Sequence, residues 1–281
     1  MVELLKPPSR RSLALLKKLV KGYHKRLVEE LERHFKPYTH AGNSTKLLKA
    51  LGLIDAGRRD LLATPLGYYV YKAIKRDLDE KILEAIVTEP GKIIITGENL
   101  FFDERVKPWH EYMASIWEPE DGKKIALFTP CSRVKPIPHS FMNRKIDALL
   151  SASPIGYMVE RLILSEPLAI IPYRYSLLFP AAHYDYPPEK LSREEIEYYI
   201  DLTALLLKKI DTSYEAIVYS LPRQHRMIFE KALEDAGVEA TYIPYNVYYL
   251  PKLKKALEET ALRLNGFRVT DVAGEVRIKI S

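Results

Sequence analysis

One short stretch, a buried apolar run followed by a polar loop and a helix, constrains this chain more than any other. Ile125–Phe128 is an unbroken apolar run that follows two lysines, a pattern typical of a strand buried on both faces of a parallel sheet. The loop after it contains Cys131 and Lys135, and apolar residues then recur at helical spacing from 141 to 150. Loops at the carboxyl ends of parallel strands form the ligand crevice of an open α/β sheet, so this loop is the first place to look for a site.

Cys131 and Lys135 have two interpretations. A lone cysteine often behaves as a small buried hydrophobe, and the lysine is then simply solvated. Alternatively, Lys135, Arg133 and backbone N–H groups favour a thiolate, the form in which cysteine acts as a nucleophile. The residues alone leave both open.

The same stretch resembles a motif of archaeosine synthases, which share a domain with archaeal tRNA-guanine transglycosylases. That motif runs Pro-Cys-Ser, a two- or three-residue spacer, Lys-Pro-Tyr, then a Ser and a His. The matching residues here are Pro130, Cys131, Ser132, Lys135, Pro136 and Ser140. Ile137 stands where the tyrosine is expected and Asn143 where the histidine is expected.

A second stretch, residues 161–188, resembles the family independently. It matches the Ser-Pro-Leu-Gly, Val-Pro and Pro-Ala-Ala-His-Tyr-Asp-Ile-Pro elements, with Leu168-Ala169 in place of Leu-Gly. Two separated motifs in the right order extend the resemblance over residues 103–236. The family's domain is similar to the uracil-DNA glycosylase fold, which implies a similar fold for this part of the chain.

Composition limits the classes of protein that fit. The chain has 281 residues and a single cysteine, which excludes an internal disulfide, a cysteine-rich zinc cage and an iron–sulfur cluster. We expect no cofactor and no metal, and any radical chemistry would belong to another protein. One glutamine and 28% charged residues suit a thermophile. The N-terminus lacks the apolar core of a signal peptide and no run approaches a membrane span, so a soluble, cytoplasmic protein without a membrane partner is expected.

Positive charge is concentrated near the N-terminus. Residues 1–85 contain eighteen Lys and Arg against ten Asp and Glu, a balance of +8, which leaves −2 for the rest of a chain of formal charge +6. Helical patterns, two short strands and a further helix in this region resemble a winged-helix domain. The residues predicted to contact nucleic acid are Lys17, Lys18, Lys46, Lys49, Arg58 and Arg59. A winged helix used for dimerisation or docking is the alternative.

The rest of the chain alternates strands and helices, which predicts an α/β fold. Strands are expected at 125–128, 161–164, 169–171, 216–220 and 240–243, helices at 193–210, 224–236 and 252–264, and a hairpin at 267–280. A further strand is expected at 92–96. We predict a winged-helix-like domain (1–85), a linker segment (86–122) and a three-layer α/β/α domain with a mostly parallel sheet (123–281).

Several polar residues should join Cys131 at the carboxyl edge of this sheet. The predicted catalytic residues are Cys131, Lys135 and Asp185. The predicted substrate-binding residues are Ser132, Ser140, Ser165, His183, Tyr184 and Arg223. His225 lies beside Arg223 and Arg226, which favours a surface histidine over a general base. The pair Glu194-Glu195 indicates the exposed face of a helix.

The resemblance implies an archaeal tRNA-modification protein. Archaeosine synthases add an amine, from lysine, to the nitrile of 7-cyano-7-deazaguanine in tRNA, and a partner radical enzyme completes the base. Free lysine and tRNA would then be the substrates. Three alternatives remain: a catalytically lapsed member that presents tRNA to a transglycosylase partner, a base-excision glycosylase, and a winged-helix DNA-binding regulator.

Overall fold

The computed structural model describes residues 25–33, 36, 44–56, 61–75, 81–86, 88–120, 122–246, 248–265, 267–272 and 275–280. The chain divides into two compact units: unit 1 comprises Met1–Ile86 and Glu111–Trp117, and unit 2 comprises Val87–His110 and Glu118–Ser281. Among the residues that the structure describes, none of the helices combines the length and the apolar character needed to cross a membrane. The limits 1–85, 86–122 and 123–281 with their assigned roles stay a prediction.

The described residues of unit 1 form short helices and an antiparallel strand pair. Its elements are helical residues 25–33, α2 (Ser44–Ala50), β1 (Ile54–Ala56), β2 (Leu61–Ala63), α3 (Pro65–Ile74) and α4 (Lys81–Ile86). The β1 and β2 strands pair antiparallel. Thr64 is the N-cap of α3, and its hydroxyl accepts a hydrogen bond from the Gly67 N–H at 3.1 Å, as expected for a Thr-Pro helix start. The winged-helix assignment itself stays a prediction, because the expected wing tip and N-terminal helix lie largely outside the described residues.

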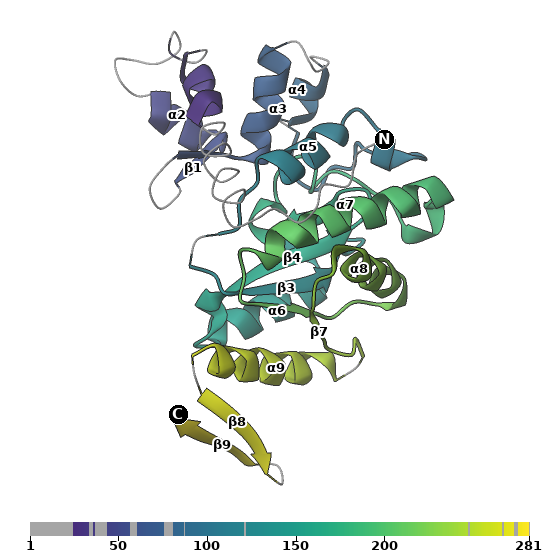
Figure 1. Cartoon of the computed structure of the whole chain (residues 1–281). Helices are drawn as coiled ribbons and strands as arrows, with labels where there is room; N and C mark the ends of the chain where they lie inside the picture. The colour runs from purple at the N-terminus through teal and green to yellow at the C-terminus, as the bar shows by residue number, and fades with distance from the viewer. Residues whose placement is uncertain are drawn as a thin grey trace. The chain divides into compact units, whose positions relative to one another are not determined.

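Unit 2 is built on a five-stranded sheet of order β5-β4-β3-β6-β7 (Figure 1). The strands are β3 (Ile125–Pro130), β4 (Val159–Ser165), β5 (Ala169–Pro172), β6 (Ala216–Tyr219) and β7 (Thr241–Tyr242). All neighbours pair in parallel except β4 and β5, which are antiparallel. Residues 166–168 are too few for the crossover that a parallel partner requires, so the chain can only turn back on itself. The predicted mixed α/β fold with a mostly parallel sheet is confirmed.

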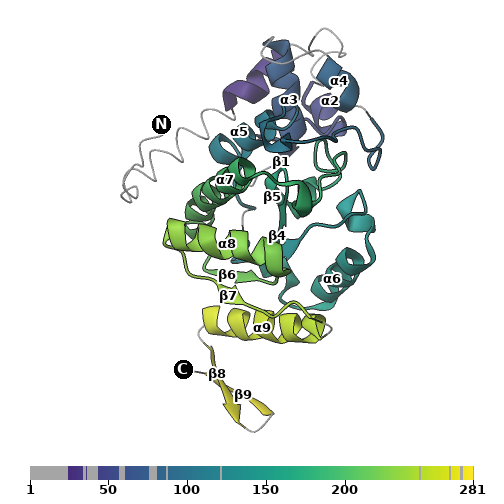
Figure 2. The ribbon, with the colours of Figure 1, turned by 90° about the vertical axis from the view of Figure 1, so that its right-hand side faces the viewer.

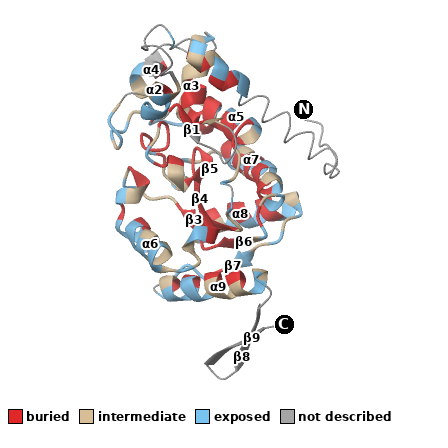
Figure 3. Ribbon diagram, turned by 90° about the vertical axis from the view of Figure 1, so that its left-hand side faces the viewer, coloured by how far each residue is buried: buried red, intermediate tan, exposed pale blue. Residues whose placement is uncertain are grey.

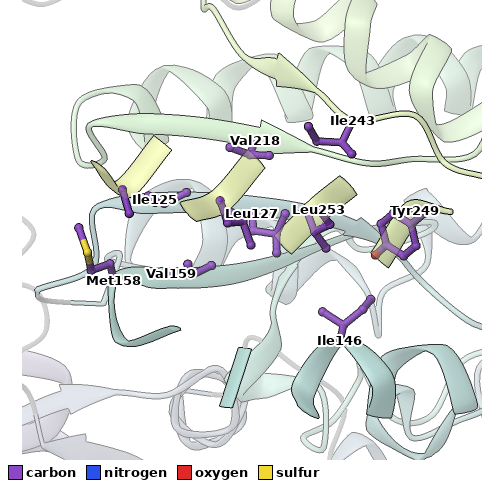
Figure 4. Close-up of a cluster of buried hydrophobic side chains, with 11 residues drawn as sticks. Ile125, Leu127, Ile146, Met158, Val159, Val218, Ile243, Tyr249 and Leu253 are labelled. Atoms are coloured by element: carbon purple, nitrogen blue, oxygen red, sulfur yellow. The ribbon is translucent and has the colours of Figure 1, made fainter. Parts of the chain in front are cut away.

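Helices cover both faces of this sheet (Figure 2). They are α6 (Phe141–Ala152), α7 (Arg193–Asp211), α8 (Arg223–Ala236) and α9 (Tyr249–Leu264). Side chains of β3 alternate between the faces: Leu127 belongs to the core cluster with α6 and α9 (Figure 4), whereas the Phe128 ring lies 4.5 Å from the Phe229 ring of α8. Burial accordingly follows the strands and the inner helix faces (Figure 3).

The remaining described elements are shorter or lie outside the sheet. They are η2 (Leu100–Phe102), α5 (Lys107–Ser115), η3 (Ile137–His139), η4 (Gly156–Met158), η5 (Tyr173–Tyr175), η6 (Pro188–Lys190), and the antiparallel strands β8 (Phe267–Val272) and β9 (Glu275–Ile280). The predicted C-terminal hairpin is thus confirmed.

Two local predictions are wrong. Residues 92–96 form no strand, because Ile95 pairs only through an isolated bridge with Tyr184 in a proline-rich loop. Glu195 is not on an exposed face: its carboxylate completes the Ser192 capping box of α7 and also accepts hydrogen bonds from the Tyr186 hydroxyl at 2.7 Å and the Phe101 N–H at 3.2 Å. A buried carboxylate with several donors is held as a structural group.

Candidate active site at the carboxyl ends of β3 and β4

The parallel pairing of β3 and β4 brings two polar residues together. Pro130 and Leu164 are partners in the register, so Cys131 and Glu166 follow adjacent strand ends. The Cys131 N–H donates to the Leu164 carbonyl at 3.2 Å, which fixes the start of the loop. His225 arrives from the first turn of α8, which follows β6, the other neighbour of β3. Three segments far apart in the sequence therefore meet at one edge of the sheet.

Cys131, Glu166 and His225 form a compact cluster. The Cys131 Sγ lies 3.8 Å from the His225 Nε2, and the same nitrogen lies 2.8 Å from the Glu166 Oε2. His225 is 6% exposed and Glu166 2% exposed, whereas Cys131 is half-buried. The thiol is thus the member of the cluster that a ligand can reach.

The cluster holds His225 in its charged form. Burial by itself lowers the pKa of His225, but hydrogen bonds to Cys131 and Glu166 and their negative charges outweigh it and raise the pKa to about 10. Both partners face Nε2, unlike a Ser-His-Asp triad, in which the two ring nitrogens bind different partners. The geometry therefore places an imidazolium beside both the Cys131 sulfur and the Glu166 carboxyl group, and a cation next to a thiol generally favours the thiolate form.

Lys135 adds a second cation to this edge. Its Nζ donates to the Ser132 carbonyl at 2.6 Å and lies 4.2 Å from the centre of the Tyr184 ring. Burial lowers the pKa of Lys135, while the charges of Cys131, Glu166 and Asp185 raise it in part. Lys135 thus lies close enough to Cys131 for the two groups to interact electrostatically, and their place in a common crevice stays a prediction.

Two buried tyrosines border the cluster. The Tyr184 hydroxyl is hydrogen-bonded to the Ser165 Oγ, and burial raises the pKa of Tyr184 well above its ordinary value, so the phenol is neutral. Burial likewise raises the pKa of Tyr199, which also interacts with the charges of Glu166 and Cys131. Within the described part of the chain the Tyr199 hydroxyl has no hydrogen-bond partner.

The same three side chains are potential metal ligands. Cys131, Glu166 and His225 each place one ligand atom within 4.8 Å of the others, and sulfur, nitrogen and oxygen are all zinc ligands. Two light-atom ligands of a tetrahedral zinc ion are about 3.3 Å apart. The 2.8 Å between His225 Nε2 and Glu166 Oε2 is a hydrogen-bond length, and Lys135 already supplies a positive charge to the thiol and the carboxylate. The observed spacing fits a shared proton better than a metal ion.

The other predicted site residues differ in what they contact. The Ser132 hydroxyl donates to the Val134 carbonyl at 2.7 Å, and the Ser140 hydroxyl caps α6. His183 is buried, with its Nδ1 3.0 Å from the Lys92 carbonyl oxygen, and burial lowers its pKa. Asp185 is exposed, and Arg223 is exposed at the start of α8. Their roles in binding or catalysis stay predictions.

Arg223 lies at the rim of an open depression next to the cluster. The residues that line it are Pro188, Pro222, Arg223, Gln224, His225 and Met227. Of the residues predicted to bind nucleic acid, Lys46 and Lys49 are exposed on α2. Lys17, Lys18, Arg58 and Arg59 lie outside the described residues.

The sequence-based interpretation of His225 as a surface histidine is wrong. Its neighbours Arg223 and Gln224 are exposed, but His225 is buried because the first turn of α8 points it at the strand ends. Glu166 was not among the predicted catalytic or substrate-binding residues. Glu166 follows the predicted strand 161–164 and His225 follows the predicted strand 216–220, and this position indicates the crevice better than the charge of the sequence neighbours does.

Unit 2 is thus an α/β fold with a buried cluster of Cys131, His225 and Glu166 at the carboxyl edge of a mostly parallel sheet. Residues 106–257, more than half of the chain, match the family described as "Domain of unknown function (DUF5591)", and the chain belongs to this family.

Two further comparisons place the chain among known proteins. Archaeosine synthase subunit alpha of Methanosarcina acetivorans is 29% identical over 120 residues, which are 42% of this chain and only 18% of that protein. The crystal structure of AF0587, a protein of unknown function, covers 61% of this chain and 63% of its own at 17% identity and a TM-score of 0.41.

Proposed function

We propose that this chain takes part in tRNA modification, and that unit 2 adds an amine from lysine to the nitrile of a 7-deazaguanine base in tRNA. The observation that carries the proposal is the Cys131–His225–Glu166 cluster, found in a chain similar to an archaeosine synthase subunit. A nitrile carbon needs a nucleophile, and its nitrogen needs a proton as the addition proceeds. A thiolate beside an imidazolium supplies both.

The reaction proceeds in two steps that balance. The Cys131 sulfur attacks the nitrile carbon, a C–S bond forms, and the nitrogen takes the proton from His225, which gives a thioimidate. The lysine amine then attacks the same carbon, the C–S bond breaks, and the surplus amine proton returns to His225. The net result is an amidine and a regenerated thiolate–imidazolium pair, with no oxidant or reductant consumed.

The surrounding residues would position the substrates. Lys135 would stabilise negative charge on the nitrile nitrogen, and the exposed Asp185 carboxylate would bind the incoming lysine or accept a proton. Ser132, Ser165, His183, Tyr184 and Arg223 would line or orient the base pocket. In unit 1, a winged-helix-like arrangement with Lys46 and Lys49 would hold the tRNA backbone.

One observation favours a second function. Ile137 and Asn143, which stand where the family motif has a tyrosine and a histidine, are both buried, and Asn143 bonds to Ser140 and Arg161. Two motif positions thus serve packing, as in a catalytically lapsed protein that binds tRNA for a transglycosylase or radical-enzyme partner.

Labelled lysine distinguishes the two functions. Purified protein is incubated with the labelled amino acid and tRNA that carries 7-cyano-7-deazaguanine, and label in the tRNA is measured. The enzymatic function is supported if the wild type transfers labelled lysine to the tRNA, Cys131→Ser and Lys135→Ala do not, and Asp185→Asn transfers less. Tight tRNA binding without any transfer would leave the tRNA-presenting function.

A further inference from the structure

Two stretches of unit 2 contain no acidic residue. Residues 122–146 carry six Lys and Arg, and residues 240–257 carry three Lys, so their formal charges are +6 and +3. Residues 86–281 as a whole carry −2, so the two stretches are positive within a slightly negative part of the chain. Lys123 and Lys124 precede β3, at the strand end opposite to Cys131, and pair with Glu120 and Glu215. The cations that follow β3 are the ones that can create a local positive potential near Cys131.

The fold brings the two stretches together beside Cys131. Ile146 of α6 and Tyr249 and Leu253 of α9 belong to one buried cluster (Figure 4). Tyr245, just before α9, interacts electrostatically with Cys131. The loop after β3 contains the thiol, the loop before α9 lies near it, and α6 follows the first loop and packs against α9.

The outward side chains of this region combine cations with aromatic rings. Arg133, Arg144 and Lys145 are exposed and have no carboxylate partner among the described residues. Phe141 is 65% exposed, and the Lys145 Nζ lies 4.3 Å from its ring centre. Tyr245 is 37% exposed. Cations without a carboxylate partner can contact phosphates, and exposed aromatic rings can stack on bases. The two together are typical of surfaces that bind single-stranded nucleotides.

We propose that these five residues, Arg133, Phe141, Arg144, Lys145 and Tyr245, form an RNA-binding face that holds the unpaired nucleotides on either side of the base presented to Cys131. The proposal rests on the proposed function, because it names the surface of unit 2 that delivers the tRNA. A membrane is a poorer fit, since the outward side of α6 places Arg144 and Lys145 beside Phe141 rather than a continuous apolar band.

A charge-removal variant of the whole chain tests the cations. In the triple variant Arg133→Gln, Arg144→Gln, Lys145→Gln, tRNA binding should weaken. The magnitude of the slope of log affinity against log salt should decrease by about 2 to 3, because each lost phosphate contact removes roughly 0.7 to 0.9. The matched control removes three exposed lysines elsewhere in unit 2, Lys107→Gln, Lys190→Gln, Lys208→Gln, and should retain affinity and slope.

A second pair of variants tests the rings. Tyr245→Ala should lower tRNA affinity by roughly 5- to 150-fold without a change in salt slope, because base stacking carries no charge. Tyr157→Ala is the control, since Tyr157 is 69% exposed but precedes β4, at the strand end opposite to Cys131. It should bind like the wild type.

Equal affinity and slope for the triple variant and its control would overturn the proposal. So would loss of binding to phosphatidylserine vesicles in the triple variant with tRNA binding intact, which would make the face a membrane contact. These binding measurements do not use lysine transfer. A protein that binds through this face and transfers no lysine therefore refutes the proposed reaction and leaves the RNA-binding face standing.

Discussion

Unit 2 holds two buried polar clusters on the same pair of strands, and they differ in how completely their groups are paired. One surrounds Arg161, inside β4, and the other surrounds Cys131, after β3. Both place charge where the chain is otherwise apolar. Their comparison separates polar groups that hold the fold from polar groups that remain able to react.

The Arg161 cluster is saturated. Its guanidinium donates to the Thr129 hydroxyl at 3.1 Å, to the Asp147 carboxylate at 2.8 Å and to the Asn143 side chain, and it lies 4.2 Å from the Tyr173 ring centre. The Tyr173 hydroxyl donates to the other Asp147 oxygen. The cluster lines a small depression, yet each group already has a partner, so it serves to join α6, β4 and η5.

The Cys131 cluster is not saturated in this way. One imidazole nitrogen serves both a thiol and a carboxylate, the thiol is half-buried, and the neighbouring Tyr199 hydroxyl has no partner among the described residues. Buried polar groups normally have partners, and exceptions cluster at functional sites. The difference is that the Cys131 cluster combines a half-buried thiol with spare bonding capacity, which is what the proposed nucleophile requires, whereas the Arg161 cluster does not.

The largest expected effect comes from the sulfur. Cys131→Ser should lower lysine transfer by about 10³-fold or more, as loss of a nucleophile does, while the free energy of unfolding changes by less than about 1 kcal/mol. Single-turnover transfer and urea unfolding measure the two quantities. A stable variant with full lysine transfer would show that Cys131, like Arg161, has only a structural role.

Arg161 should show the reverse pattern. Arg161→Met removes the donor to the buried Asn143 side-chain oxygen and to one oxygen of the half-buried Asp147, which keeps its bond from Tyr173, so the free energy of unfolding should fall by about 1.5 to 3 kcal/mol. Lysine transfer by the remaining folded protein should be retained. Urea unfolding at constant pH measures the loss, and a loss below about 1 kcal/mol would show that the saturated cluster does not stabilise the fold.

The raised pKa of His225 predicts a pH-dependent stability. A group whose pKa is raised on folding, here from 6.5 to about 10, contributes its full stabilisation below 6.5 and loses it as the pH rises through about 10. Between these limits the free energy of unfolding should fall by about 1.4 kcal/mol per pH unit. The variant His225→Gln keeps Cys131, Glu166 and Lys135. Its free energy of unfolding should fall less steeply with pH than that of the wild type. Equal slopes for variant and wild type would show that His225 carries no extra proton.

The smallest effect should come from the unpartnered phenol. Tyr199→Phe removes a hydroxyl that has no hydrogen-bond partner in the described region, so stability should change by less than about 0.5 kcal/mol. Tyr184→Phe is the matched comparison, because it removes the bond to Ser165 and should cost about 1 kcal/mol. Thermal unfolding measures the loss of stability of both variants. A loss for Tyr199→Phe at least as large as that for Tyr184→Phe would show that the Tyr199 hydroxyl has a hydrogen-bond partner.

Much of unit 2 was predictable because its signals are local. The apolar run at Ile125–Phe128 and the periodic helices fall within observed elements, since a strand buried on both faces and an amphipathic helix each leave a distinct pattern. The antiparallel direction of β5 was not foreseen, although the three-residue connection after Ser165 demands it. Segment 92–96 has a strand's composition but meets no open sheet edge.

The site was harder to predict because it depends on which side chains meet. Cys131 and Lys135 share one loop, so their proximity follows from the sequence. The partner of the sulfur lies 94 residues away, and whether His225 faces solvent or the sheet depends on the orientation of α8. The charge of sequence neighbours such as Arg223 therefore indicated, wrongly, that His225 lies on the surface. Its position after a parallel strand indicates correctly that it lies at the strand ends.

The central claim, that Cys131 is a nucleophile activated by His225, can be measured directly because the chain has only one cysteine. Alkylation by iodoacetamide at pH 7, followed by intact-mass spectrometry, reports that thiol alone. We expect native protein to react faster than the urea-unfolded chain, and we expect His225→Gln to remove the difference. A native thiol that reacts more slowly than the unfolded one, with or without His225, would contradict the central claim.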